Sequence, residues 1–193
     1  MNFDKLGWKT LESYFLNNPY YLTQHHVNSY DNFINKEIFE IINEKNPIQI
    51  SKNFDERLDD FKFKIKLYIG GLDGKQIYFG KPVIYDDRHS HYMYPNEARL
   101  RNMTYAFTIH YDVFITYEII KSPAEIIKGE LMLPKIYMGR FPIMLHSSKC
   151  ILKNVNRELK FNMGECKNDY GGYFIIDGKE KVIIPQEKFS DNM

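Results

Sequence analysis

The sequence predicts an α+β fold in which N-terminal helices pack on a mostly antiparallel β-sheet. Apolar residues recur at helical spacing in the first part of the chain, whereas from Phe61 onward they alternate with polar residues. Near the C-terminus, Asp177-Gly178 separates two β-rich runs and predicts a tight hairpin. Helices followed by strands are the order typical of α+β proteins.

Two helices are expected before the first strand. Trp8, Leu11 and Phe15 share one face of a helix over residues 5–17, and Pro19 ends it. A second helix is predicted over residues 27–43. Its apolar stripe contains Val27, Tyr30, Phe33, Ile34, Ile38, Ile41 and Ile42.

Strand periodicity begins in FKFKIKLYI, residues 61–69. Its apolar side chains face one way, and Lys62, Lys64 and Lys66 face the other. We interpret the lysine row as a solvated or edge-protecting face, with contact to a phosphate backbone as the alternative. GGLDGKQ (70–76) is expected to close a hairpin into the next strand. It is too short for a phosphate-binding loop, and Gln76 stands where such a loop has Ser or Thr.

IYMGRFPIML (136–145) is a short apolar segment that predicts an edge strand or a bent strand, because Pro142 lies inside it. The stretch YPNEARLRNMTYAF (94–107) poses a different question. The apolar odd-numbered row that runs from Met103 to Ile119 would, if extended backward, contain Glu97, Arg99 and Arg101. Either the chain bends near Asn102, or these charges face something that is neither core nor bulk water.

The composition limits the function classes. The chain has 193 residues, 44% of them apolar, which is enough for one packed domain or a domain with a helical arm. A net charge of +1 predicts no strong global attraction to nucleic acid or anionic lipid. Two cysteines without a CxxC pair indicate a reducing, intracellular compartment. No signal peptide or membrane-spanning run is seen, so no membrane partner is expected.

The search for catalytic chemistry is negative. His25-His26 and the pair His89 and His91 suggest metal ligands, but their spacing and the lack of a third ligand argue against a metal site. No nucleophile elbow, Asp-rich magnesium loop or dinucleotide turn is present. The pattern alone predicts a non-catalytic module that interacts with protein or nucleic acid.

Four segments together resemble the N-terminal region of the second-largest subunit of multisubunit DNA-directed RNA polymerases, the relative of the bacterial β subunit. The segments are HHVNSYDNFI, YPNEARLRNMTYAF, YMGRFPIMLHSSKC and GGYFIIDGKEKVIIPQE. They occur in the family's order and cover most of the chain from about Gln24 onward. GGYFI and the histidine-containing helix are similar to the eukaryotic version of the family. Abundant Tyr, Phe, Ile, Asn and Lys are typical of an AT-rich genome, which suggests a large DNA virus as one possible source.

The resemblance implies the protrusion domain, a wall of the cleft that holds the template DNA and the RNA–DNA hybrid. It implies a helical arm over residues 1–22 and the N-terminal part of the protrusion domain over residues 23–193, so the chain is expected to be a fragment of a longer subunit. Its partners would be the nucleic acids, the largest subunit and the rest of its own subunit. No catalytic residue or cofactor is expected in this chain, because the Mg²⁺ ion belongs to the largest subunit. The location would be the nucleus, or the viral factory or cytoplasm of an infected cell.

Five residues become candidates for nucleic-acid contact by this resemblance: Arg99, Arg101, Lys179, Lys181 and Gln186. For the two arginines we favour a structural role, in which Glu97 and another acid pair with them and stabilise a bend before Met103. Gln186 matches a family position near the hybrid, although Pro185 departs from the small polar residue found there. The alternative function is a free-standing nucleic-acid-binding or subunit-docking protein derived from the same domain.

Overall fold

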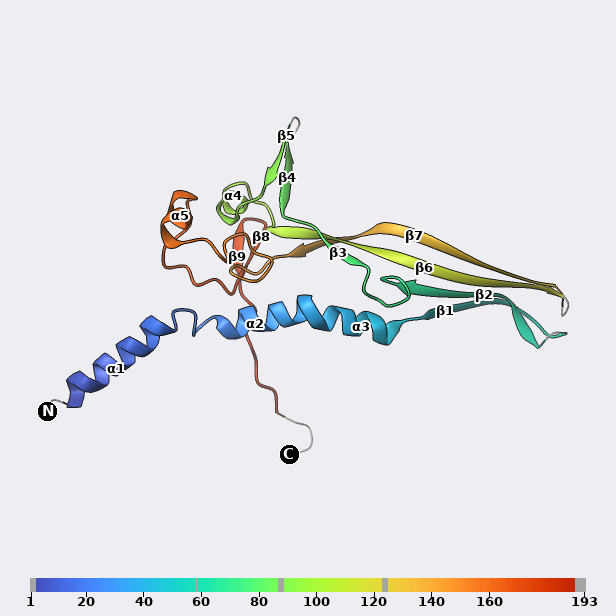
Figure 1. Cartoon of the computed structure of the whole chain (residues 1–193), viewed down its shortest axis with the longest axis horizontal. Helices are drawn as coiled ribbons and strands as arrows, with labels where there is room; N and C mark the ends of the chain where they lie inside the picture. The colour runs from blue at the N-terminus through green and yellow to red at the C-terminus, as the bar shows by residue number, and fades with distance from the viewer. Residues whose placement is uncertain (1–2, 58, 87–88, 123–124, 190–193) are drawn as a thin grey trace. The chain divides into compact units, whose positions relative to one another are not determined.

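The computed structural model describes residues 3–57, 59–86, 89–122 and 125–189. The chain divides into two compact units. The first contains Met1–Asp31, Pro82–Ala106 and Pro142–Met193, and the second contains Asn32–Lys81 and Phe107–Phe141. Both units mix helix and strand, as Figure 1 shows, and the predicted α+β class is confirmed. The division predicted between residues 22 and 23 stays a prediction.

The second unit is built on an antiparallel five-stranded sheet with the order β1-β2-β6-β3, in which β7 also pairs with β6. Its strands are β1 (Ile48–Asp55), β2 (Asp60–Ile69), β3 (Ile77–Phe79), β6 (Ala106–Ser122) and β7 (Glu125–Pro142). The strand predicted over residues 61–69 is therefore confirmed as β2. Ile65 lies opposite Ile50 of β1 and Tyr117 of β6, so the alternating pattern carries its apolar row across three strands.

The expected hairpin at residues 70–76 is wrong. β2 and β3 do not pair with each other, and both pair with β6, at Ile69↔Val113 and Ile77↔Tyr111. The amide of Gln76 donates to Gly70 O (2.8 Å) and closes the base of the loop. Asp112 of β6 accepts from Gly70 N (2.7 Å) and donates to Gln76 O (3.1 Å). The glycine-rich segment is therefore a loop that connects two strands, β2 and β3, which both pair with β6.

The edge or bent strand expected in residues 136–145 is confirmed, because among the described strands β7 pairs with β6 alone, but its bounds differ from the expected ones. These residues begin as the last part of β7, a strand of 18 residues that ends at Pro142. Lys135 has a positive φ of 51°, and its amide donates to Asp112 Oδ1 at 2.7 Å. The carboxylate of Asp112 thus holds this irregular point of β7 against β6. The strand continues through the irregularity instead of starting after it.

The predicted helices are both present. α1 covers Phe3–Asn17, and the second helical run contains α2 (Gln24–Asn32), a π-helical turn η1 (Phe33–Glu37) and α3 (Ile38–Lys45). Within the second unit, η1 and α3 pack on the sheet: Phe33 stacks on Phe141 at 5.9 Å, and Phe39 meets Phe79 at 6.3 Å between ring centroids. By contrast, the described side chains of α1 are all exposed.

The first unit surrounds a small core with short elements. After α1 and α2 these are β4 (Val83–Asp86), β5 (His89–Tyr92), α4 (Pro95–Leu100), α5 (Arg157–Asn162), β8 (Phe174–Ile176) and β9 (Lys179–Lys181). Fully buried side chains include Met93, Tyr105, Ile143, Leu145 and Ile175. Main-chain bonds tie the segments together: Tyr105 N donates to Ile175 O (3.0 Å), and Ile143 N donates to Tyr105 O (2.9 Å).

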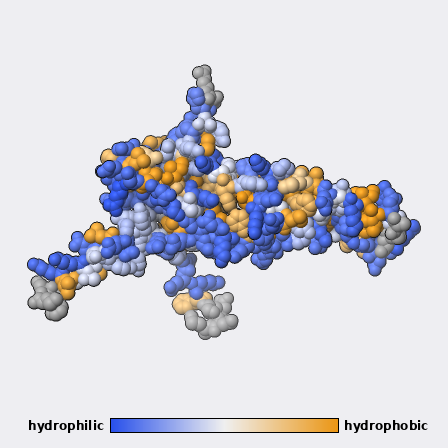
Figure 2. Space-filling model, in the orientation of Figure 1, coloured by the Kyte–Doolittle hydropathy of each residue, from blue (hydrophilic) through white to orange (hydrophobic). Residues whose placement is uncertain are grey.

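Figure 2 shows hydrophobic side chains interspersed among hydrophilic ones over the strands. On β7, exposed apolar residues include Ile126, Leu131, Leu133 and Met138. Among the described residues, no helix has the length and apolar character needed to cross a bilayer.

Candidate nucleic-acid interface

The stretch that precedes Met103 is a helix and not a strand. Pro95 occupies the first turn of α4, where its missing N–H is no loss, and Glu97 lies in that turn near the positive end of the helix dipole. Asn102 adopts a positive φ of 52°, and Met103 N donates to Ala98 O at 2.8 Å. A left-handed residue just after the last turn is a common helix end. The chain therefore bends at Asn102, which explains why the charges do not belong to the core-facing row of β6.

Arg99 extends from α4 into a group of acids and a tyrosine that come from other segments of the first unit. Its Nη1 donates to Glu165 Oε2 (2.8 Å), its Nε donates to Glu180 Oε1 (2.9 Å), and its Nη2 donates to Tyr173 OH (2.7 Å). Tyr173 in turn donates to Asp169 Oδ2 at 2.6 Å. All three guanidinium nitrogens are engaged, as a structural role requires.

The electrostatics of this group are those of a buried ion pair. The side chain of Glu165 is 2% exposed and that of Arg99 is 21% exposed. Burial disfavours the charge on Arg99, yet the hydrogen bond and the charge of Glu165, together with Tyr173, raise its pKa above the ordinary value. Burial and the hydrogen bond to Asp169 raise the pKa of Tyr173. Arg99 therefore stays charged and Tyr173 stays protonated at neutral pH.

Arg101 is paired closer to the surface. It donates to Asp86 Oδ1 of β4 (2.9 Å) and to Glu97 Oε1 (3.0 Å), and His91 Nε2 of β5 lies 3.0 Å from the same Glu97 oxygen. The hydrogen bond from Arg101 lowers the pKa of Asp86. The cluster ties the β4–β5 hairpin to α4. Of the histidines considered as metal ligands, His91 thus has a carboxylate partner, and no group of three or more His, Cys, Asp or Glu in the described part of the chain could hold a metal ion.

The hairpin predicted at Asp177-Gly178 is confirmed. β8 and β9 pair with Phe174 opposite Lys181, and both turn residues have positive φ, 50° and 73°. The turn packs on the end of α4: Gly178 N donates to Met103 O (3.0 Å), and a Cβ at Gly178 would lie 2.8 Å from Asn102 Cα. Only glycine fits this contact without displacement of the backbone.

The hairpin presents the two candidate lysines. Lys179 and Lys181 are exposed and alternate along β9 with Glu180, whose carboxylate is held by Arg99. Neither lysine forms an ion pair with another described residue. Gln186 is also exposed, in the irregular segment that follows β9. Arg99 therefore anchors the strand, and Lys179 and Lys181 are the charges on it that stay available.

The alternative lysine row on β2 is partly neutralised. Lys62 pairs with Asp55 at 3.0 Å, and Lys64 pairs with Asp60 at 2.5 Å. This geometry agrees with the solvated-face interpretation.

Sequence reasoning missed the partners of Arg99. It expected Glu97 and one more acid near the two arginines, whereas Arg99 uses Glu165, Glu180 and Tyr173. Glu180 carries a signal in hindsight, because it is an acid that alternates with two lysines in a short strand. No local pattern distinguishes Glu165.

The profile of the family described as "RNA polymerase beta subunit" matches residues 21–193. The chain belongs to this family.

Relatives within the RNA polymerase beta subunit family include DNA-directed RNA polymerase II subunit 2 of Arabidopsis thaliana, 37% identical over 96% of this chain. DNA-directed RNA polymerase II subunit RPB2 of Eremothecium gossypii is 34% identical over 97% of the chain. Subunit Rpo2N of Methanothermobacter thermautotrophicus (strain Delta H) is 31% identical over 97% of it. The chain spans 16% of each of the two eukaryotic relatives and 32% of the archaeal one. All three are cellular proteins and give no support to a viral source.

Three of the four segments that carry the family resemblance meet in the first unit. Tyr105 from the second segment accepts a main-chain bond from Ile143 of the third and donates one to Ile175 of the fourth. Leu145 N donates to Tyr173 O (2.9 Å), which joins the third and fourth segments again. The family pattern thus corresponds to the contacts that hold the β8–β9 hairpin in place.

Proposed function

We propose that this chain is part of the second-largest subunit of DNA-directed RNA polymerase and forms there the protrusion wall beside the template DNA and the RNA–DNA hybrid. Its role is to hold nucleic acid and other subunits while catalysis takes place elsewhere. Membership in the RNA polymerase beta subunit family supports the first part of the proposal. The observation that carries the second part is a hairpin that exposes Lys179 and Lys181 and is anchored by the Arg99–Glu180 ion pair.

Phosphate contact fits these lysines better than base recognition does. A polymerase has to hold every sequence that it transcribes, and contacts to phosphate carry no sequence information. Two lysines on the same face of a strand place their ammonium groups along one line, as a backbone of regularly spaced phosphates requires. Arg99 and Arg101 are assigned to structure, because carboxylates of the first unit already pair with both. Gln186 is assigned an uncharged contact to nucleic acid from the segment that follows β9.

The remaining assignments concern the whole enzyme. Its partners would be the largest subunit and the rest of the second-largest subunit, and its location would be inside the cell, in the nucleus for a polymerase of the RNA polymerase II kind. The catalytic Mg²⁺ would be bound by the largest subunit, and this chain would contribute no catalytic residue. Co-expression with the largest subunit of the same source would test the partnership by co-purification.

The test of the nucleic-acid surface is fluorescence anisotropy with a labelled DNA duplex and a labelled DNA–RNA hybrid at several salt concentrations. Lys179→Ala and Lys181→Ala should each weaken binding of every sequence equally and flatten the salt slope by about one unit. Gln186→Ala should weaken binding without any change of slope, because no counterion is released by a neutral side chain. Melting temperatures should stay unchanged in all three variants.

Lys62→Ala is the matched control, since it removes a strand lysine that already pairs with Asp55. It should leave both affinity and slope unchanged. A flattened slope in Lys62→Ala, with none in the two β9 variants, would move the interface to β2. Sequence-selective binding with sub-micromolar affinity at physiological salt would contradict the proposed function.

A further inference from the structure

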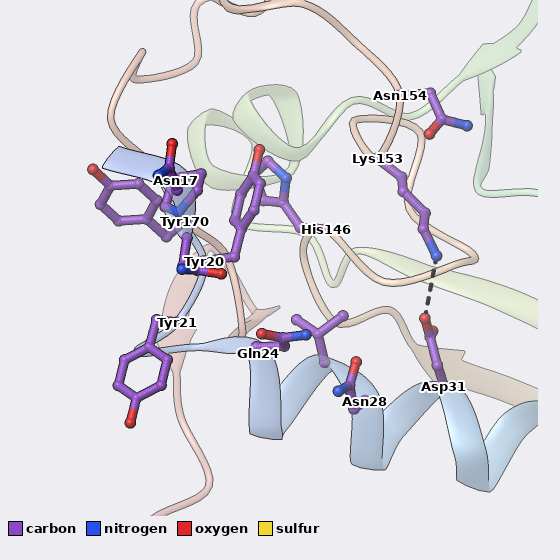
Figure 3. A pocket seen from close by; sticks show the side chains of 13 residues that line it. Asn17, Tyr20, Tyr21, Gln24, Asn28, Asp31, His146, Lys153, Asn154 and Tyr170 are labelled. Atoms are coloured by element: carbon purple, nitrogen blue, oxygen red, sulfur yellow. Dashed lines mark hydrogen bonds and ion pairs between the residues drawn. The ribbon is translucent and has the colours of Figure 1, made fainter. Parts of the chain in front are cut away.

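The first unit contains a pocket of about 420 Å³, lined by the end of α1, by α2 and by the loops that carry His146, Lys153 and Tyr170 (Figure 3). The acid and the lysine on its wall pair with each other, because Asp31 Oδ2 lies 3.3 Å from Lys153 Nζ (the dashed line in Figure 3). The described part of this wall therefore offers no unpaired carboxylate or ammonium group that would select a ligand. A more informative surface lies in the second unit, along β7.

The outer edge of β7 is open to another strand. Of the strands that the structure describes, only β6 pairs with β7, and it does so along one edge (Figure 1). Pro134, the left-handed Lys135 (φ 51°) and Pro142 interrupt the second half of the strand. Residues 125–133 contain no proline and no left-handed residue. The outward N–H and C=O groups of this first half thus form a regular template for pairing.

The side chains along the open half of β7 are unusually apolar for an unpaired edge. Four large ones are between 39% and 50% exposed: Ile126, Ile127, Leu131 and Met132. Proteins usually protect such an edge with charges, prolines or a covering segment. An exposed edge that is both regular and apolar is therefore a surface for association.

The open half of β7 is self-complementary about Gly129. Lys128 and Glu130 flank this glycine, one on each side. If two copies of β7 pair in antiparallel orientation with Gly129 on a two-fold axis, Lys128 of each copy lies opposite Glu130 of the other. The pairs farther from the axis are apolar: Ile127 with Leu131, and Ile126 with Met132. Opposite charges and apolar side chains that face each other directly stabilise an antiparallel pair.

Contacts with β6 show which side chains of β7 share a face. Lys128 Nζ lies 2.7 Å from Glu118 Oε1, so the even-numbered residues of both strands share the polar face. A Cβ at Gly129 would collide with Tyr117 Oη, so the odd-numbered residues share the other face. Tyr117 lies opposite Ile65, and this second face therefore continues the apolar row of β2. An axis between two residues would join the apolar face of one copy to the polar face of the other, whereas an axis on a residue keeps both faces continuous.

The charges select Gly129 among the neighbouring positions for this axis. An axis at Lys128 would place two lysines opposite each other, and an axis at Glu130 would place two glutamates opposite each other, which is destabilising in both cases. With the axis at Gly129, both charges of each copy gain a partner of opposite sign. Glu130 forms no ion pair with another residue that the structure describes, so the second copy would supply its cation.

We propose that residues 125–133 of β7 are a dimerisation edge, where a second copy of this chain pairs in antiparallel orientation with Gly129 on the two-fold axis. The sheets of the two copies then form one continuous sheet. One pair of edge strands buries less surface than a standard protein–protein interface, so the dimer exchanges reversibly with the monomer. This inference does not depend on the proposed polymerase role, since it rests only on the sequence, the exposure and the pairing of β7.

A charge-reversal series on the full chain tests the pairing. Sedimentation equilibrium from about 1 µM to several hundred micromolar gives the dissociation constant of the dimer. Lys128→Glu and Glu130→Lys should each raise this constant about tenfold, because two like-charged pairs replace two pairs of opposite charge. The double variant should return to within about threefold of the parent chain. Both Lys128→Glu and the double variant lose the contact with Glu118, so the recovery reports the pair between copies.

A matched pair of leucine variants tests the apolar part of the edge. Leu131→Lys removes an apolar side chain from the edge, and Leu72→Lys makes the same change in the loop between β2 and β3, where the side chain is 63% exposed. The first substitution should raise the dissociation constant about tenfold, since each dimer loses two apolar contacts. The second should leave it unchanged. Both leucines are exposed in the monomer, so neither variant should lower the melting temperature.

Cysteine cross-linking tests the register. The background is Cys166→Ser, because Cys166 is exposed and Cys150 is buried. Ile126→Cys protein is mixed with Met132→Cys protein and oxidised mildly. Positions 126 and 132 of different copies face each other within reach of a disulfide, whereas two copies of position 126 lie about 20 Å apart along the edge. A covalent dimer should therefore form in the mixture and in neither protein alone.

Each of these measurements has an outcome that would overturn the inference. A chain that stays monomeric over the whole concentration range would leave the edge of β7 to another partner or to solvent. Association that is equally strong in Leu131→Lys and the parent chain would place the contact elsewhere. A double charge variant that regains no affinity, or cross-linking as efficient in the separate proteins as in the mixture, would exclude the register about Gly129. Circular dichroism and melting temperature establish that each variant is folded.

Discussion

Arg99 and Glu180 lie 81 residues apart in the chain and are joined by a 2.9 Å contact between Nε and Oε1. The contact connects the last turn of α4 with the middle of β9. On its other side the same guanidinium binds the buried Glu165. Three segments of the first unit are thus tied together by one side chain, and the exposed lysines of β9 take their position from it.

Removal of this side chain should be costly for folding and nearly neutral for nucleic-acid binding. Arg99→Ala is expected to lower the free energy of unfolding by about 2–4 kcal/mol, because Glu165 would lose its cation while it stays buried. DNA affinity, measured on folded protein, should change less than in Lys179→Ala. Urea denaturation and fluorescence anisotropy give the two quantities.

Arg101→Ala is the control, since its partners Asp86 and Glu97 are more exposed than Glu165. Its melting temperature should fall less than that of Arg99→Ala. Unchanged stability in Arg99→Ala together with a flatter salt slope for DNA would reverse the assignment and make Arg99 a phosphate contact.

The turn glycine of the β8–β9 hairpin should tolerate no side chain. Gly178→Ala places a Cβ 2.8 Å from Asn102 Cα and 3.0 Å from Arg99 O, at a φ of 73°. We expect a loss of about 1–3 kcal/mol in the free energy of unfolding, from strain and from displacement of the turn.

Gly7→Ala provides the opposite case. Gly7 lies inside α1, and a Cβ there would have no neighbour within 4 Å. The substitution should therefore have no steric cost and should favour the helix by roughly 0.5–1 kcal/mol. Helix content by circular dichroism and thermal melting distinguish the two variants. Equal tolerance of both substitutions would show that the hairpin turn does not pack on Asn102.

The stability of the first unit should fall as the pH drops below 6.5, the ordinary pKa of histidine, because His146 is buried as a neutral ring. Burial, and secondly the charge of Lys160, lower the pKa of His146 below 6.5, with Asp169 acting in the opposite direction. The unfolded chain therefore binds this proton more readily than the folded chain. The stabilisation is fully present above pH 6.5 and is lost as the pH falls from 6.5 through the folded-state pKa.

Urea denaturation at pH 7.5 and pH 5.5 tests this dependence. The parent chain should lose more stability between the two conditions than His146→Asn, which lacks the titrating ring. His26→Asn serves for comparison, because burial also lowers the pKa of His26. This substitution should remove a different part of the pH dependence of stability from the part that His146→Asn removes. Identical pH dependence in the parent chain and His146→Asn would show that His146 is not buried as a neutral ring.

The sequence by itself determined the features of this protein that depend on neighbouring residues. The apolar spacing of α1, the alternation in β2 and the Asp177-Gly178 turn act over a few positions, so a local pattern predicts them. The four ordered segments likewise determined the family, because they are read from residue identity alone. The sequence also offered two interpretations of the charges before Met103: a bend near Asn102, or a strand whose charges face neither core nor bulk water. The end of helix α4 at Asn102 shows that the bend is correct.

Tertiary structure alone decided which distant groups meet. The loop at residues 70–76 closes on Asp112 of β6 instead of forming a hairpin, because both of its flanking strands pair with β6. Arg99 takes Glu165 and Glu180 as partners, more than 60 residues away, and no short pattern encodes that choice. The buried contact between His146 Nδ1 and Lys160 Nζ (3.3 Å) exists only because α5 brings Lys160 to the ring and Gly171 packs against it. Burial gives these groups their energies, and burial is a property of the folded chain, in which residues remote in sequence exclude water from one another.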